Sequence, residues 1–235
     1  LIVTHNEKRV KDIYENYRFF DRNVNDYPSR DIIFYSADVH GQALVRKRLT
    51  VIQKLLEHEP VTVVTTIDGL MDSLLPPEKL AQQIIRLREG GVYDPKDLVK
   101  RLIYMGFERA VQVEGPGQFS VRGGILDIYN LADDCPYRIE FWDDEIDTIR
   151  SFDVDSQRSI ERHERISVYP AAEIVFTDAR IQNGLERLKR DVDKGIRLFK
   201  KEGKPEEASH LKHLYEEAKE AFDFSFAGAN MDSLI

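Results

Sequence analysis

A run of six β-branched residues, Val-Thr-Val-Val-Thr-Thr at 61–66, most constrains the fold of this chain. Such a run is typical of a strand that is buried on both faces of a parallel sheet. Two further apolar runs, at 1–4 and 31–35, also predict strands, and segments with helical spacing of apolar residues separate the three. Asn6 is a suitable N-cap for the first helix, and Pro60 ends the second. Strands that alternate with helices predict an α/β layer with right-handed crossovers.

The middle of the chain has a different pattern, which begins after Pro76-Pro77. It predicts a strand at 83–89 and a helix that starts at Asp94-Pro95 and ends at Gly106. Short strands punctuated by glycine follow at 115–129. The segments 137–142 and 145–152 then predict a hairpin around Asp143-Asp144. We therefore expect a small α+β domain at about 81–155.

The last part of the chain predicts two short strands and two long helices. The strands are expected at 165–169 and 173–177, separated by Pro170. Two amphipathic helices follow, with Gly203-Lys204-Pro205 between them. We expect these helices to cover the sheet formed by the first part of the chain.

Charge and cysteine content exclude several classes of protein. The chain has a net charge of −8, and residues 81–155 alone contain 9 basic and 15 acidic residues, so this part should repel a duplex DNA backbone. The single cysteine, Cys135, excludes an internal disulfide and a multi-thiolate zinc site, and indicates a reducing, cytoplasmic compartment. No apolar run is long enough for a membrane span.

The sequence evidence for catalytic and metal-binding groups is weak. None of the 13 glycines belongs to a phosphate-binding loop, since Gly203-Lys204 is followed by proline. Acidic residues gather at 140–147, but neighbouring side chains of a strand point to opposite faces, so a solvated turn is the better interpretation. His210 and His213 lack an acidic ligand at a suitable offset. We therefore predict no catalytic residue, no metal ligand and no cofactor-binding residue in this chain.

Two arginines suggest a recognition surface. Arg109 follows the end of the predicted helix, and Arg122 lies in the glycine-rich stretch close to Phe119. Arginine flanked by aromatic residues is typical of protein interfaces. An equally good interpretation is that both arginines form ion pairs with acidic residues of their own domain.

At these residues the sequence resembles a known family. The matching segments are 107–109, 117–129, 137–153, 155–159 and 169–173. They resemble the UvrB-homology module, which occurs in the excision-repair protein UvrB and at the N-terminus of the bacterial transcription-repair coupling factor. The resemblance covers nearly the whole chain and is weakest over the C-terminal helices. The stretch from Tyr27 to His40 lacks the tyrosine-rich insertion of UvrB, and the chain begins at the strand that would follow a phosphate loop. The lack of that insertion favours the N-terminal module of a coupling factor, cut from a longer protein. The segment 153–159 also looks more like the coupling factor's version than UvrB's.

The resemblance implies a fold and a partner. It implies a degenerate, phosphate-loop-like α/β domain split into 1–80 and 156–235, with an inserted α+β domain at 81–155 that binds UvrA. Arg109 and Arg122 match two arginines of UvrB implicated in that contact, whereas Ser120 stands where the family has a third. The resemblance adds Phe119, Arg138 and Glu140 as weaker members of the surface.

The function implied by the resemblance is docking without catalysis. The module would bind UvrA and recruit nucleotide excision repair to a stalled RNA polymerase. Other domains of the parent, an ATP-dependent DNA translocase, would contact RNA polymerase and DNA and would use ATP and Mg. The alternative is a fragment of a UvrB-type, DNA-binding ATPase subunit of the excision nuclease.

Overall fold

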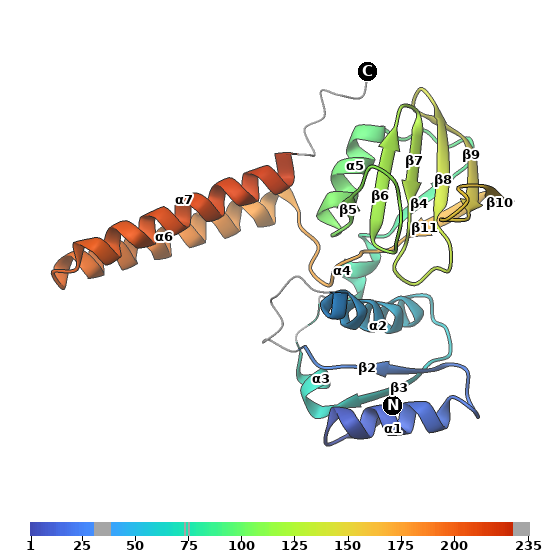
Figure 1. Cartoon of the computed structure of the whole chain (residues 1–235), viewed down its shortest axis with the longest axis horizontal. Coiled ribbons are helices and arrows are strands. Elements are labelled where there is room, and N and C mark those ends of the chain that lie inside the picture. The colour runs from blue at the N-terminus through green and yellow to red at the C-terminus, as the bar shows by residue number, and fades with distance from the viewer. Residues whose placement is uncertain (31–38, 73, 75, 228–235) are drawn as a thin grey trace. The chain divides into compact units, whose positions relative to one another are not determined.

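The computed structural model describes residues 1–30, 39–72, 74 and 76–227, and its first part is an α/β layer (Figure 1). The elements are β1 (Ile2–Thr4), α1 (Glu7–Tyr17), β2 (Val24–Tyr27), α2 (Val39–Leu56), β3 (Thr62–Thr66), α3 (Ile67–Met71) and α4 (Pro77–Ala81). The three strands form a parallel sheet in the order β1-β3-β2. Val64 in the central strand is fully buried, which confirms the buried strand predicted at 61–66.

Helices lie on both sides of this sheet (Figure 1). Val10 of α1 packs with Val24 and Val64 on one side, and a second cluster joins Tyr27 to Leu49 and neighbouring residues of α2. The α1 helix begins where predicted, because the side chain of Asn6 accepts a hydrogen bond from the Arg9 amide at 2.8 Å.

One strand of this layer was missed. The sequence predicts a strand at 31–35, which lies outside the described residues. The structure instead shows β2 at Val24–Tyr27, where the sequence Val-Asn-Asp-Tyr has only two apolar residues. Val24 and Tyr27 are buried at the two ends of the strand, and the polar residues between them carry no hydrophobic signal.

The middle of the chain forms a six-stranded sheet, in the order β10-β9-β8-β7-β6-β5. Its strands are β5 (Glu108–Arg109), β6 (Gln118–Arg122), β7 (Ile125–Ile128), β8 (Tyr137–Trp142), β9 (Glu145–Phe152) and β10 (Ser159–Arg162). All neighbours are antiparallel except β5 and β6, which are parallel. The predicted hairpin is confirmed as β8 and β9, and Asp143 in its turn has a φ of 59°.

A second, two-stranded sheet pairs β4 (Ile85–Arg88) with β11 (Arg165–Val168), so two further predicted strands are confirmed. The strand predicted at 173–177 is wrong, because no strand forms there. Just before it, the amides of Ala171 and Ala172 both donate to the carbonyl of Met105, at 2.9 and 3.0 Å. These two residues share one acceptor, which is not the hydrogen-bond pattern of a strand ladder.

The C-terminal helices α6 (Asp178–Lys201) and α7 (Pro205–Ala227) form the predicted pair and lie side by side (Figure 1). The chain divides into two compact units. One contains Leu1–Asp94 and Met105–Val175. The other contains Phe176–Ile235 and Pro95–Tyr104, the residues of helix α5. The mixed α/β class is confirmed. The split domain at 1–80 and 156–235, its phosphate-loop-like character and the covering role of the two helices stay predictions.

Candidate functional site

A buried carboxylate, Asp127, organises one face of the six-stranded sheet. Only 1% of Asp127 is exposed, although it lies in the middle of strand β7. Arg138 of β8 donates to both of its carboxylate oxygens, at 2.8 and 2.9 Å, and Arg122 of β6 donates to one, at 2.7 Å. The strand register explains this group, because Asp127 is opposite Ser120 on one side and Arg138 on the other. The hydrogen bonds with Asp127 raise the pKa of Arg138 above its ordinary value.

Arg138 is fixed from several sides. Its guanidinium also donates to the side chain of Gln157 at 3.0 Å and lies 4.3 Å from the centre of the Phe152 ring. Its side chain is only 16% exposed. Arg138 therefore serves mainly to anchor Asp127 within the sheet.

Arg122 is held on one side and open on the other. Its side chain remains 44% exposed while it binds Asp127. Arg122 ends strand β6, and the turn to β7 is made by Gly123 and Gly124. Gly123 has a φ of 58°, and a Cβ on Gly124 would lie 3.0 Å from the carbonyl oxygen of Phe141. The turn therefore requires glycine at these positions. It directly follows Arg122, which is a fixed, partly exposed cation.

Arg109 and Arg122 do not lie on the same face of the six-stranded sheet. Arg109 lies in β5, opposite Phe119. Residues that are paired across a sheet share a face, and Phe119 is paired in turn with buried Ile128, whereas Arg122 lies with Asp127 on the other face. Arg109 is exposed at the edge of the sheet. Arg109 and Arg122 therefore lie on opposite faces of the sheet rather than side by side.

The remaining predicted residues differ in exposure. Phe119 is fully buried, so its ring supports the sheet from the core and offers no contact surface. Ser120 is 1% exposed and donates to the carbonyl of Val111 at 2.8 Å. Glu140 is half-buried and accepts a hydrogen bond from Thr148 at 2.9 Å. Of the predicted set, Arg122, Arg138 and Glu140 share the face of Asp127.

Two exposed apolar side chains near this face were missed by the sequence reasoning. Trp142 is 82% exposed at the end of β8, and Val111 is 91% exposed after β5. The amide of Phe141 donates to the carbonyl of Gly124 at 2.7 Å, so the end of β8 lies beside the turn that carries Arg122. A tryptophan directly before an Asp-Asp turn could have indicated an exposed aromatic group.

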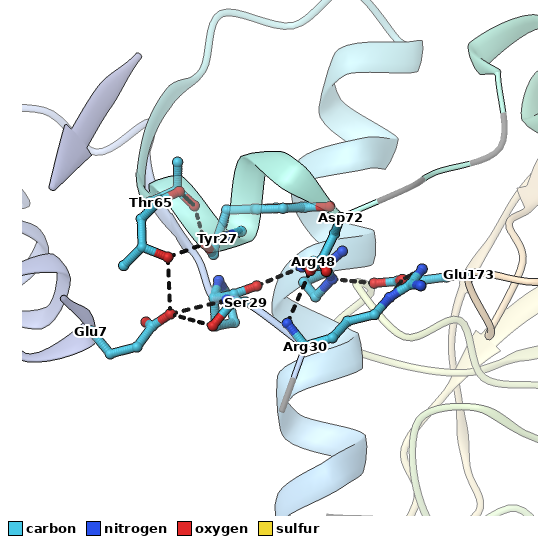
Figure 2. A network of polar contacts seen from close by, with 11 residues as sticks. Glu7, Tyr27, Ser29, Arg30, Arg48, Thr65, Asp72 and Glu173 are labelled. Carbon is cyan, nitrogen blue, oxygen red and sulfur yellow. Dashed lines mark hydrogen bonds and ion pairs between the residues drawn. The ribbon is translucent and has the colours of Figure 1, made fainter. Parts of the chain in front are cut away.

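A second polar cluster, the Arg48 network, surrounds a buried arginine of α2 (Figure 2). Arg48 is 1% exposed and binds Glu173, and it donates to Asp72 at 2.8 Å and to the carbonyl of Pro28 at 2.6 Å. Arg30 also binds Glu173, through its Nε at 2.7 Å. The network thus ties the α/β layer to the segment that follows β11.

Tyr27 packs under the Arg48 network, with its ring centre 4.3 Å from the guanidinium. Within the described structure, the Tyr27 hydroxyl is buried and has no hydrogen-bond partner. Burial raises the pKa of Tyr27 to about 12, and burial is also the largest cause of a pKa of about 12 for Tyr169.

These shifts predict a loss of stability at alkaline pH. A tyrosine with a raised pKa in the folded state stabilises the fold fully below the unfolded pKa of about 10, and this contribution is lost as the pH rises toward 12. We expect the free energy of unfolding, measured by urea titration, to fall between pH 10 and 12. Tyr27→Phe should flatten this fall and should not destabilise the protein at pH 7, because the hydroxyl has no partner to lose.

Tyr17, which is 41% exposed on α1, provides the control. Tyr17→Phe should leave the alkaline profile as it is in the parent chain. An unchanged profile for Tyr27→Phe would contradict the assignment to Tyr27.

Among the described residues, no group of three or more His, Cys, Asp or Glu side chains could hold a metal ion. None of the helices in that part of the chain combines the length and apolar composition needed to cross a membrane. The acidic residues 143–145 are exposed in the hairpin turn. The partly exposed arginines around Asp127 are Arg122 and Arg138, whose side chains are 44% and 16% exposed.

Comparison with known proteins finds one matching family model and several relatives. Residues 85–174 match the model of the UvrB interaction domain. The chain is 32% identical, over 95% of its length, to a transcription-repair-coupling factor of Bacillus subtilis, of which it covers 21%. It is 30% identical, over 90% of its length, to the UvrABC system protein B of Treponema denticola, of which it covers 34%. A transcription-repair-coupling factor of Staphylococcus haemolyticus is 33% identical over 86% of the chain, which covers 18% of that protein. The chain thus spans about a third or less of the length of these relatives.

Proposed function

From the premise that residues 85–174 form a UvrB interaction domain, we propose that this chain is a docking module that binds UvrA in nucleotide excision repair. In this proposal it is the N-terminal module of a transcription-repair coupling factor and acts in the cytoplasm. It recruits the repair proteins to a stalled RNA polymerase. The module itself needs no cofactor. Other domains of the parent protein use ATP and Mg and contact DNA during translocation.

The main support for the proposal is that Arg122 is both fixed in orientation and partly exposed. A buried carboxylate orients its guanidinium, and 44% of the side chain stays exposed. A cation fixed in this way loses little side-chain entropy on binding and can form a charge-assisted hydrogen bond with an acidic partner. Exposed Trp142 and Val111 supply apolar area nearby.

Arg109 contributes from the edge of the same sheet. Its exposed position on β5 would let a partner that wraps around this edge contact both arginines. Glu140 and Arg138 lie on the Asp127 face, where they help to set its shape and charge. Ser120 leaves the surface with one cation fewer than the family pattern has.

Reversing both charges tests the proposal. Arg109→Glu combined with Arg122→Glu should abolish capture of purified UvrA on the immobilised chain, since loss of one central arginine typically costs about 2 kcal/mol or more. Arg88→Glu combined with Arg165→Glu is the matched control, because these arginines are exposed and paired on the two-stranded sheet. Retained UvrA capture by the first variant would contradict the proposal.

The alternative, a fragment of a UvrB-type ATPase subunit, is favoured by the similarity to UvrABC system protein B over 90% of the chain. It predicts a Gly-Lys-Ser/Thr phosphate loop in the sequence that precedes residue 1. The docking proposal predicts that this loop is degenerate there. Sequence upstream of Leu1 therefore separates the two.

A further inference from the structure

The two C-terminal helices carry opposite charges. Helix α6 contains 8 basic and 4 acidic residues, whereas α7 contains 2 lysines and 6 acidic residues. Because these charges nearly cancel, the C-terminal part of the chain has little net charge as a whole. The charge is thus segregated between two helices that lie side by side (Figure 1).

The basic residues of α6 form a narrow stripe. We define the basic stripe as Arg187, Arg190, Lys194, Arg197 and Lys201, all of which are exposed. With 100° of rotation and 1.5 Å of rise per residue, these five side chains lie within an arc of roughly 80° and extend over roughly 21 Å. They therefore form one line along the helix.

The basic stripe faces away from α7. Half-buried Ile181, Val192 and Phe199 lie on the opposite side of α6 by helical rotation. A Cβ on Gly195 would lie 2.8 Å from Leu211 of α7, which places the contact between the helices on the apolar side. The cations are therefore left to solvent.

Few acidic groups neutralise the basic stripe. Lys194 forms a 3.6 Å ion pair with Asp191, in which both side chains are more than 70% exposed. Arg197 donates to the carbonyl of Asp193 at 3.1 Å. Within the described part of the chain, the structure records no acidic partner for Arg187, Arg190 or Lys201. Exposed ion pairs of this kind are weak, so the stripe keeps most of its positive charge.

We propose that the basic stripe of α6 binds the phosphate backbone of duplex DNA without sequence specificity. Protein interfaces are centred on clusters of apolar and aromatic side chains, whereas a single exposed leucine, Leu198, borders the stripe. Binding to a phosphate backbone requires only aligned cations, and one DNA strand offers a phosphate every ~3.4 Å along the axis, or roughly six over the length of the stripe. The stripe lies outside the acidic UvrB interaction domain and is independent of the proposed contact with UvrA.

The test is fluorescence anisotropy of the 235-residue chain with a labelled 30-base-pair duplex at ~20 to ~200 mM salt, a range over which phosphate contacts weaken strongly. Five phosphate contacts predict a slope of about −4.5 for the logarithm of the binding constant against that of the salt concentration. Two unrelated duplex sequences should bind equally well.

Charge reversal locates the site. Arg187→Glu, Arg190→Glu and Arg197→Glu together should weaken binding at least ~10-fold at low salt and reduce the slope to about −2, since two stripe cations remain. The matched control combines Lys189→Glu, Lys200→Glu and Lys212→Glu, which changes the net charge equally at exposed positions off the stripe. Circular dichroism checks that both variants are folded.

The proposal is overturned if the parent chain does not bind the duplex at low salt, a result that would favour an acidic protein as the partner of the stripe. It is also overturned if the control variant loses as much binding as the stripe variant. Neither result would bear on UvrA capture, which depends on Arg109 and Arg122.

Discussion

Replacing Arg48 with alanine is expected to lower the free energy of unfolding by about 3–5 kcal/mol, the range for breaking a buried ion pair. The change removes a 1% exposed guanidinium from the Arg48 network and leaves the Glu173 carboxylate, 7% exposed, with Arg30 alone. It also removes the hydrogen bonds that Arg48 donates to the carbonyl of Pro28 and to Asp72, which keeps only the one from the Arg30 amide. Urea unfolding at pH 7, followed by circular dichroism, measures the effect.

The neighbouring lysine provides the control for this prediction. Lys47 binds Asp26 at 2.6 Å, but its side chain is 49% exposed. Lys47→Ala should therefore cost less than about 1 kcal/mol. Arg48→Met combined with Glu173→Gln should recover part of the lost stability, because no buried charge is then left alone. A loss below ~1 kcal/mol for Arg48→Ala would show that the Arg48 network does not hold the segment after β11.

Replacing Asp127 with asparagine is expected to weaken UvrA binding, although Asp127 is too buried to touch a partner. Asparagine cannot accept the two-pronged contact from Arg138 and also neutralise Arg122. Arg122 would then be free to move, and binding would have to order it again, which costs about 0.5–1.5 kcal/mol for such a side chain. We therefore expect UvrA affinity to fall by roughly 2- to 13-fold.

Asp127→Asn should also destabilise the fold by about 1.5–3 kcal/mol, the usual value of hydrogen bonds to a charged group. Ser151→Ala separates the effect on stability from the effect on UvrA affinity. Ser151 is buried in the same sheet, and its hydroxyl donates to the carbonyl of Glu161 rather than to Asp127 or the arginines. This substitution should leave UvrA affinity unchanged at a temperature where both variants are folded. Equal affinity for Asp127→Asn and the parent chain would contradict the positioning role of Asp127.

The strands with a strong apolar pattern of their own could be predicted from the sequence. The β-branched run at 61–66 and the hairpin around Asp143 could be identified because their strands carry strong apolar patterns. Strand β2 could not, because its stability comes from pairing with β3 rather than from its own composition. The segment at 173–177 looked like a strand, yet Glu173 serves as a buried ion-pair partner of Arg48.

The candidate site was predictable in part. Sequence reasoning selected Arg122 but left open whether it forms an ion pair with its own domain, and the structure shows that it does so while remaining partly exposed. Only the strand register reveals that Asp127 lies between Arg122 and Arg138. The Arg48 network joins residues 125 positions apart, and no local pattern indicates such a contact.

Calorimetric titration of purified UvrA into the 235-residue chain measures the proposed UvrA contact itself. We expect saturable binding by the parent chain and unchanged binding for Arg88→Glu with Arg165→Glu. For Arg122→Glu we expect a loss of about 2 kcal/mol or more, which is roughly 30-fold in affinity. Equal binding of UvrA by the parent chain and Arg122→Glu, or no binding by the folded parent chain, would contradict the proposed contact.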